Sequence, residues 1–201
     1  MVFELEYLIA VGCSAFGPDA INYMVPRLDL SRAGVVLLAH IETRDIYDFL
    51  KSKKVNVAYP RKNMDIRPGQ VFLNDEFSPR ARFKTKQGSL VTGSIDIGME
   101  NLSHMYGDKC IGVILSGSGA DGVKGVKAIH DSGGKILVQV EELLETYRTK
   151  KRNGTNYPAF YAPLMPDAVL RRVTPYFKGP IDELTLALNG LITDQAQKAA
   201  S

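Results

Sequence analysis

Residues 111–122 read Ile-Gly-Val-Ile-Leu-Ser-Gly-Ser-Gly-Ala-Asp-Gly, an apolar run that passes directly into a glycine-rich turn. Apolar residues at helical spacing follow the turn over residues 123–129. A short continuous apolar run is typical of a strand buried on both faces of a parallel sheet. The stretch therefore predicts a strand, a tight turn and a helix in succession, which is the repeating unit of an α/β fold.

The same succession continues outward on both sides of this stretch. Apolar runs at residues 7–11 and 35–39 stop at Gly12 and His40, and a further run follows at residues 136–140. Strands that alternate with helices predict a single doubly wound, mostly parallel sheet with helices on both faces. The helices that we expect around these strands cover residues 21–28, 45–51, 94–106, 123–129, 166–172 and 181–192.

The middle of the chain departs from this alternation. Residues 82–85 and 89–92 flank Gln87-Gly88, a pattern that predicts a β-hairpin. Arg67-Pro68-Gly69 predicts a turn ahead of another strand at residues 70–73. We therefore expect a β-hairpin excursion from the middle of the sheet.

The composition of the chain is that of an ordinary globular protein. Its 201 residues are 45% hydrophobic and 23% charged, and the formal net charge is only +3. These values predict one domain with a core of normal size and argue against a nucleic-acid footprint over the whole surface. The basic run at residues 148–152 is interpreted as a solvated loop, and residues 196–201 as a frayed tail.

The cysteines and the N-terminus bear on the compartment. Cys13 and Cys110 are too few for a disulfide framework or a cysteine metal site, and they favour a reducing environment. The first six residues are acidic where a signal peptide would be basic, and no apolar run approaches the length of a membrane span. We therefore expect a cytoplasmic protein without membrane insertion, metal or cofactor.

One serine, one histidine and one aspartate are expected at the same edge of the sheet. Ser14 follows the first strand, His40 ends the second, and Asp121 lies in the glycine-rich turn. Sites in open parallel sheets lie beyond the carboxyl ends of the strands. A serine deprotonated by an imidazole, which a carboxylate holds in place, is the set that nucleophilic acyl transfer requires. The sequence therefore predicts a Ser14–His40–Asp121 triad.

Each of these residues also has a plain structural interpretation. Ser14 and Asp121 could each cap the helix that follows them. His40 could be a hydrogen-bonded histidine at a strand end. The other two histidines, His104 and His130, lie within or near the ends of predicted helices and are weaker candidates for a catalytic base. Cys13 is a weaker candidate for the nucleophile than its neighbour Ser14, because a cysteine is commonly just buried.

The glycine-rich turn supports a competing interpretation. Residues 117–122 match the pattern G-x-G-x-x-G, and Glu141 follows the next strand about twenty residues later. This is the arrangement of a dinucleotide site, in which the acid binds the ribose. It leaves Ser14 and His40 without a role, and Asp121 would repel the phosphates that pack on such a turn. A dinucleotide-binding α/β protein stays an alternative.

Three segments of the chain resemble the CheB-type chemotaxis protein-glutamate methylesterases. Residues 11–20, Val-Gly-Cys-Ser-Ala-Phe-Gly-Pro-Asp-Ala, resemble the strand and turn that carry the family's nucleophilic serine. Residues 35–40 resemble its second strand, which ends in the catalytic histidine, and residues 112–125 resemble the L-T-G-M-G-x-D-G stretch with the catalytic aspartate. The order of serine, histidine and aspartate is also the same. The resemblance spans most of residues 8–168.

The resemblance implies a methylesterase catalytic domain over residues 1–195, a tail over residues 196–201 and no receiver domain in this chain. It implies a serine hydrolase that removes the methyl ester from glutamate side chains. Its partners would be the cytoplasmic helices of methylated chemotaxis receptors or another protein ester substrate, and not nucleic acid. Some family members also deamidate glutamine.

The resemblance also implies a role for each site residue. Ser14 would attack the ester carbonyl, His40 would take and return the proton, and Asp121 would orient His40. Backbone N–H groups at Ala15 and Ser118 would form the oxyanion hole.

The chain departs from the family around this expected site. Ala15 stands where the family has threonine, Ser118 where its glycine loop has methionine, and a longer basic connection runs over residues 141–166. The segments 42–45 and 92–93 also differ from the family pattern. The triad residues are unchanged, so we expect the same fold with weakened or altered activity. At the extreme, the chain would be a low-activity relative that acts as a signalling module.

Overall fold

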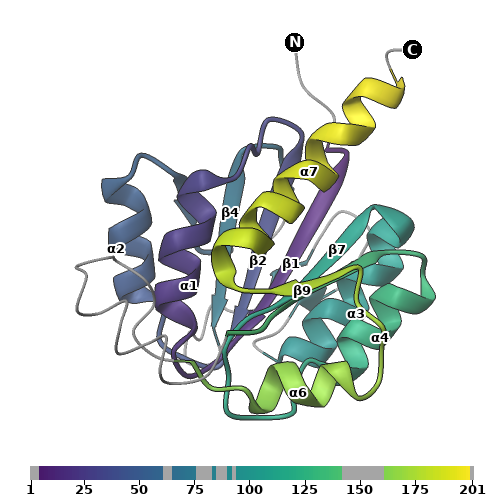
Figure 1. Cartoon of the computed structure of the whole chain (residues 1–201). Coiled ribbons are helices and arrows are strands. Elements are labelled where there is room, and N and C mark those ends of the chain that lie inside the picture. The colour runs from purple at the N-terminus through teal and green to yellow at the C-terminus, as the bar shows by residue number, and fades with distance from the viewer. Residues whose placement is uncertain are drawn as a thin grey trace.

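One parallel sheet organises the molecule (Figure 1). The computed structural model describes residues 5–60, 65–75, 83–84, 90–91, 94–141 and 161–199. Across the described sheet the strand order is β3-β4-β2-β1-β7-β8-β9, and every neighbouring pair runs parallel. The predicted α/β class is confirmed. The strands are β1 (Tyr7–Cys13), β2 (Ala33–Ala39), β3 (Asn56–Ala58), β4 (Gln70–Asp75), β7 (Cys110–Ile114), β8 (Lys135–Gln139) and β9 (Phe177–Gly179).

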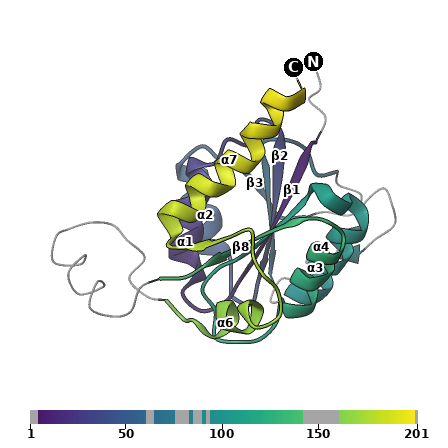
Figure 2. The ribbon, with the colours of Figure 1, turned by 45° about the vertical axis from the view of Figure 1, so that its right-hand side comes forward.

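Helices cover both faces of the sheet, as Figure 1 and Figure 2 show. Helices α1, α2 and α7 pack on one face, and α3, α4 and α6 pack on the other. No helix in the described part of the chain is long and apolar enough to cross a bilayer. The helices are α1 (Gly17–Met24), α2 (Arg44–Ser52), α3 (Ile95–Tyr106), α4 (Val123–Asp131), α6 (Leu164–Leu170) and α7 (Ile181–Ala199).

Side chains of β1 alternate between the two apolar layers. Ile9 and Val11 belong to the cluster that includes α1, α2 and α7, whereas Leu8 and Ala10 belong to the cluster with α3, α4 and α6. All four side chains are fully buried. A strand covered on both faces has no solvent-facing position, which is why its sequence is continuously apolar rather than alternating.

The expected hairpin is present, and several element boundaries differ from the prediction. Strand β5 (Phe83–Lys84) pairs antiparallel with β6 (Leu90–Val91), while the turn between them and the basic run at 148–152 lie outside the described residues. The edge strands β3 and β9 were not predicted, because each has only three residues and no long apolar run. Helix α7 continues to Ala199, into the expected tail.

The chain reverses its direction across the sheet at β1. From β1 it builds β2, β3 and β4 on one side, and it then returns to place β7 against the other side of β1. The carboxyl ends of β1 and β7 therefore form the topological switch point, where open α/β sheets place their binding sites. Ser14 directly follows β1, and the glycine-rich turn directly follows β7.

Candidate active site

His40 and Asp121 are in direct contact across the switch point. Nε2 of His40 lies 2.7 Å from Oδ2 of Asp121, and their side chains are 24% and 22% exposed. His40 follows β2, and Asp121 comes from the turn after β7, so β1 separates the two strands that deliver them. An imidazole held by a carboxylate, as found here, supplies two of the three members of a nucleophilic triad.

The N-terminus of α3 holds the Asp121 carboxylate in place. Oδ2 accepts the N–H of Ile95 at 2.9 Å, and Oδ1 accepts the N–H of Asp96 at 3.0 Å. Burial raises the pKa of Asp121, but the hydrogen bonds from His40, Asp96 and Ile95 outweigh it and hold the pKa well below its usual range. Asp121 is therefore ionised in the folded protein near neutral pH.

The Asp96 carboxylate binds the start of α4 in the same way that the Asp121 carboxylate binds the start of α3. Its Oδ1 accepts the N–H of Gly125 in the first turn of α4 at 2.9 Å. A Cβ at Gly125 would lie 2.5 Å from Cβ of Met99, so only glycine permits this approach of α4 to α3. Burial and the neighbouring charge of Asp121 raise the pKa of Asp96. Helices α3 and α4 thus pack closely against each other next to Asp121.

Asp121 is not the cap of the helix that follows it. The N-cap of α4 is Gly122, which has a left-handed backbone and no side-chain cap. The Asp121 side chain is turned toward α3 and His40 instead, apart from a 2.9 Å hydrogen bond from the N–H of Gly122. The helix-cap interpretation of Asp121 was therefore wrong for α4, because the partner that needs the carboxylate lies on another helix.

Ser14 and His40 follow the ends of two paired strands. Cys13 and Ala39 are the last partners in the β1–β2 register, and Ser14 and His40 come directly after them in the chain. The N–H of His40 donates to the carbonyl of Cys13 at 3.2 Å. The N–H of Ser14 donates to the carbonyl of Ser116 at 3.1 Å, and the Ser14 side chain is buried. The fold thus gathers the three predicted residues at one edge.

The turn after Ser14 is tight. The N–H of Gly17 donates to the carbonyl of Ser14 at 2.9 Å, and a Cβ at Gly17 would lie 2.6 Å from Cβ of Cys13. The N-cap of α1 is Phe16 rather than Ser14, so Ser14 does not cap this helix. Cys13 is fully buried, and burial raises the pKa of its thiol to about 12, which leaves no thiolate to act as a nucleophile.

A buried hydrogen-bonded chain, which the sequence analysis missed, supports the Ser14 turn. Oγ of Ser116 donates to the carbonyl of Ala15 at 3.0 Å, and the N–H of Ser116 donates to Oε1 of Gln139 at 2.9 Å. Nε2 of Gln139 donates to Oε1 of Glu141 at 2.9 Å. One signal could have revealed this chain: Gln139 is a polar residue inside an apolar strand, and a fully buried amide requires hydrogen-bond partners.

Glu141 is not placed to bind a ribose. Its Oε1 accepts the N–H of Ile181 at 3.1 Å, so the carboxylate sits at the N-terminus of α7. In the glycine-rich turn, Gly117 hydrogen-bonds through its backbone to Ala162 and Met165, each at 3.0 Å. Because Asp121 faces His40 and Glu141 faces α7, the structure does not support the dinucleotide-binding alternative.

The two expected oxyanion donors lie on either side of the switch point. Ala15 is half-buried in the turn after β1, and Ser118 is exposed in the turn after β7. Their role as oxyanion donors stays a prediction. Among the described residues, no group of three or more His, Cys, Asp or Glu side chains is arranged to hold a metal ion.

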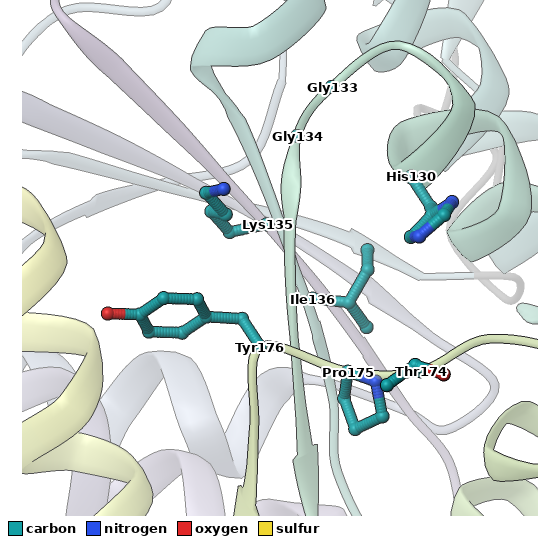
Figure 3. A pocket seen from close by; sticks show the side chains of 8 residues that line it. All are labelled: His130, Gly133, Gly134, Lys135, Ile136, Thr174, Pro175 and Tyr176. Carbon is teal, nitrogen blue, oxygen red and sulfur yellow. The ribbon is translucent and has the colours of Figure 1, made fainter.

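A cavity of about 310 Å³ lies at the opposite, amino-terminal edge of the sheet (Figure 3). Its lining comes from the end of α4 and from the residues that lead into β8 and β9. The lining includes an ammonium, a phenol and an imidazole but no carboxylate. The cavity therefore does not belong to the triad. The lining residues are His130, Gly133, Gly134, Lys135, Ile136, Thr174, Pro175 and Tyr176.

The fold matches a solved structure. The chain aligns with the crystal structure of the Thermotoga maritima CheB methylesterase catalytic domain with a TM-score of 0.70 and 19% identity, covering 92% of this chain and 98% of that one. At this identity the match shows the fold alone.

Sequence relatives show the family. A protein-glutamate methylesterase/protein-glutamine glutaminase of Symbiobacterium thermophilum is 31% identical over 66% of this chain and 40% of its own length. A putative one of Leptospira interrogans is 30% identical over 65% of this chain and 75% of its own length. The chain spans less than half the length of each of the first three curated relatives. The family model described as CheB methylesterase matches residues 9–151, and the chain belongs to this family.

Proposed function

We propose that this chain is a serine hydrolase that removes the methyl ester from glutamate side chains of a protein substrate. The 2.7 Å contact between His40 and Asp121 supports the proposal most directly, together with the position of Ser14 and His40 directly after the paired ends of β1 and β2. Residues 1–195 would form the catalytic domain. Because Nε2 of His40 faces Asp121, Nδ1 is the nitrogen that would take the proton of Ser14.

The proposed reaction has two acyl-transfer steps. Oγ of Ser14 attacks the ester carbonyl carbon as its proton passes to His40, and the oxygen of the tetrahedral intermediate becomes an anion. The intermediate then collapses, and methanol leaves with the proton from His40. Water, deprotonated by His40, attacks the acyl-enzyme, which releases the glutamate carboxylate and restores Ser14. Asp121 stabilises the imidazolium each time His40 holds a proton and orients the neutral ring between these steps.

Backbone amides near the switch point would stabilise the oxyanion. Ala15 directly follows the nucleophile, and the N–H of Ser118 lies in the turn that carries Asp121. One donor of this kind is worth about 3–4 kcal/mol in the transition state. Because Ala15 lacks the hydroxyl of the family's threonine, we expect slower turnover than that of family members that keep the threonine.

The names of the relatives suggest the substrate. Proteins named protein-glutamate methylesterase/protein-glutamine glutaminase act on a glutamate ester and on the corresponding amide, and both reactions use the same acyl chemistry with methanol or ammonia as the leaving group. We further propose that this ester lies on methylated chemotaxis receptor helices in the cytoplasm, which is the substrate that the sequence resemblance implies. A peptide that contains γ-methyl glutamate is the simplest probe of this substrate.

The release of methanol from such a peptide tests the proposal. The native chain should release methanol, and Ser14→Ala should lower the rate by several orders of magnitude while the protein stays folded. Ser52→Ala is the matched control, because Ser52 ends α2 on the other edge of the sheet and should leave the rate unchanged. Equal rates for native protein and a folded Ser14→Ala variant would overturn the proposed function.

A further inference from the structure

Two non-glycine residues in the described part of the chain have a left-handed backbone. They are Phe16, with φ of 64°, and Lys54, with φ of 62°. This conformation brings Cβ too close to the following carbonyl oxygen, and a bulky residue that adopts it is unusual. Phe16 lies two residues after Ser14, in the turn that leads into α1. Backbone strain of this kind concentrates at functional sites.

The Phe16 side chain is also exposed at an unusual place. It is 46% exposed, although phenylalanine is among the residue types that are most often buried. Two other large exposed apolar residues, Ile97 and Leu164, lie in the first turns of α3 and α6. The first turn of α3 holds Asp121, and the N–H of Met165, next to Leu164, donates to the carbonyl of Gly117 at 3.0 Å.

Three separate elements near the proposed triad therefore each carry an exposed apolar residue: Phe16 follows the nucleophile, Ile97 lies in the helical turn that binds Asp121, and Leu164 precedes the residue that binds the glycine-rich turn. The scissile group itself, a methyl ester on a short side chain, is too small to cover them. Exposed apolar groups gathered at one site mark a surface that contacts a partner. Phe16 is nearest to the nucleophile along the chain, and its backbone strain means that its position is maintained at a cost in stability.

We propose that Phe16 is a specificity-determining residue that packs against an apolar side chain of the substrate protein beside the glutamate ester. This inference rests on the proposed function, because it concerns the choice among glutamate esters. It deepens that function by naming the neighbours that the methylated glutamate should have.

The experiment compares two peptides that each carry one γ-methyl glutamate, flanked by leucine in one and by serine in the other. Native protein should favour the leucine peptide in kcat/KM by about ten-fold, as expected for an apolar contact in a specificity site. Phe16→Ala and Phe16→Gly should abolish most of this preference, chiefly through KM, and should keep hydrolysis of the serine peptide. Lys54→Ala and Lys54→Gly should keep the native preference, because Lys54 lies at the amino-terminal edge before β3.

The same four variants measure the backbone strain. At each position the glycine variant should melt about 2–4 °C above the alanine variant, because glycine alone adopts the left-handed backbone without strain. Phe16→Gly should thus gain stability over Phe16→Ala and still lack the preference for the leucine peptide.

Two outcomes would overturn the inference. In the first, both Phe16 variants discriminate between the peptides as well as native protein does. In the second, Phe16→Ala and Phe16→Gly melt at the same temperature while the expected difference appears at Lys54. If native protein hydrolyses neither peptide, the proposed function itself fails, and this result is distinct from hydrolysis of both peptides without a role for Phe16.

Discussion

The two edges of the sheet differ in what they hold. At the carboxyl edge, Ser14, His40 and Asp121 lie at the ends of neighbouring strands, and the Asp121 carboxylate is tied to His40 and to the N-terminus of α3. At the amino edge there is a cavity of about 310 Å³, in which Lys135 and Tyr176 form a cation–π contact at 5.8 Å. The carboxyl edge has connected polar groups, and the amino edge has a cavity lined by an ammonium, a phenol and an imidazole.

The carboxyl edge thus holds a hydrogen-bonded cluster of charged groups, whereas the cavity at the amino edge has no carboxylate in its lining. Strand ends and helix N-termini converge at the carboxyl edge, so charged groups can be held there without extended side chains. The amino edge receives the C-terminal end of α4, which supplies carbonyl groups rather than N–H donors. Variants at the two edges should therefore differ sharply in activity, and the following predictions run from the largest expected effect to the smallest.

Removing the charge of Asp121 should have the largest effect. Asp121→Asn should lower kcat for ester hydrolysis by about 10⁴-fold, because a neutral amide neither fixes the tautomer of His40 nor stabilises its protonated form. Single-turnover kinetics with a γ-methyl glutamate peptide would measure the loss. Asp131→Asn is the control, since Asp131 pairs with the exposed Lys127 on α4 and should not affect turnover. A loss of less than ten-fold for Asp121→Asn would separate this carboxylate from catalysis.

Breaking the buried chain at Gln139 should have an intermediate effect. Gln139→Leu leaves the N–H of Ser116 without its acceptor, which should cost about 1–3 kcal/mol of stability. It should also shift the Ser14 turn and lower kcat by about 10–100-fold with little change in KM.

Thr185→Val provides the control for Gln139. Thr185 is also buried, and its Oγ1 donates to the carbonyl of Ile181 within α7. This substitution should lower stability in urea unfolding without affecting kcat. If both variants lower kcat in proportion to their loss of stability, Gln139 has no special connection to the site.

The pH dependence of stability should report the environment of Asp121. The folded-state pKa of Asp121 is lowered, so its ionised form stabilises the fold fully above the ordinary aspartate pKa of about 3.9. This contribution is lost as pH falls through the lowered folded-state pKa. The difference in unfolding free energy between native protein and Asp121→Asn should therefore shrink as the pH falls below about 4.

Asp131 again supplies the contrast. Its pKa is also lowered, first by the hydrogen bond from Lys127, but it lies on the surface, where salt screens the interaction. The effect of Asp131→Asn should be small and should vanish at high salt, whereas that of Asp121→Asn should persist. Equal salt sensitivity of the two variants would contradict the partly buried setting of Asp121.

Substitutions at the amino edge should have the smallest effect. Lys135→Ala and Tyr176→Ala remove the two largest exposed side chains of the cavity in Figure 3, and each should change stability by no more than about 0.5 kcal/mol. Ester hydrolysis should be unchanged within error. A clear loss of activity in either variant would mean that the cavity is coupled to the chemistry, and the contrast between the edges would fail.

The sheet could be predicted from the sequence because its central strands β1, β2 and β7 are continuously apolar runs of five to seven residues. A run such as residues 7–11 is continuously apolar, and only burial on both faces explains such a pattern. The hairpin could be predicted from Gln87-Gly88 between its two strands. The edge strands β3 and β9 could not be predicted, since three-residue strands carry too little pattern.

The candidate site was only partly accessible to sequence reasoning. Ser14, His40 and Asp121 each follow a predicted strand, and the parallel order of those strands brings them to one edge. The groups that hold them could not be predicted: Ile95 and Asp121 are far apart in the chain, and only the packing of α3 against α4 brings them together. The local pattern at residues 117–122 fits a dinucleotide turn equally well, and the side-chain contact of Asp121 decides between the two.

Covalent labelling of the nucleophile tests the central claim most directly. A fluorophosphonate probe, which reacts with serines activated by a neighbouring base, should add once to the native chain, and peptide mass mapping should place the adduct on Ser14. Labelling should be slowed by orders of magnitude in His40→Ala and should persist in Lys135→Ala. No adduct under conditions that label an active serine hydrolase, or an adduct on a residue other than Ser14, would contradict the proposed triad.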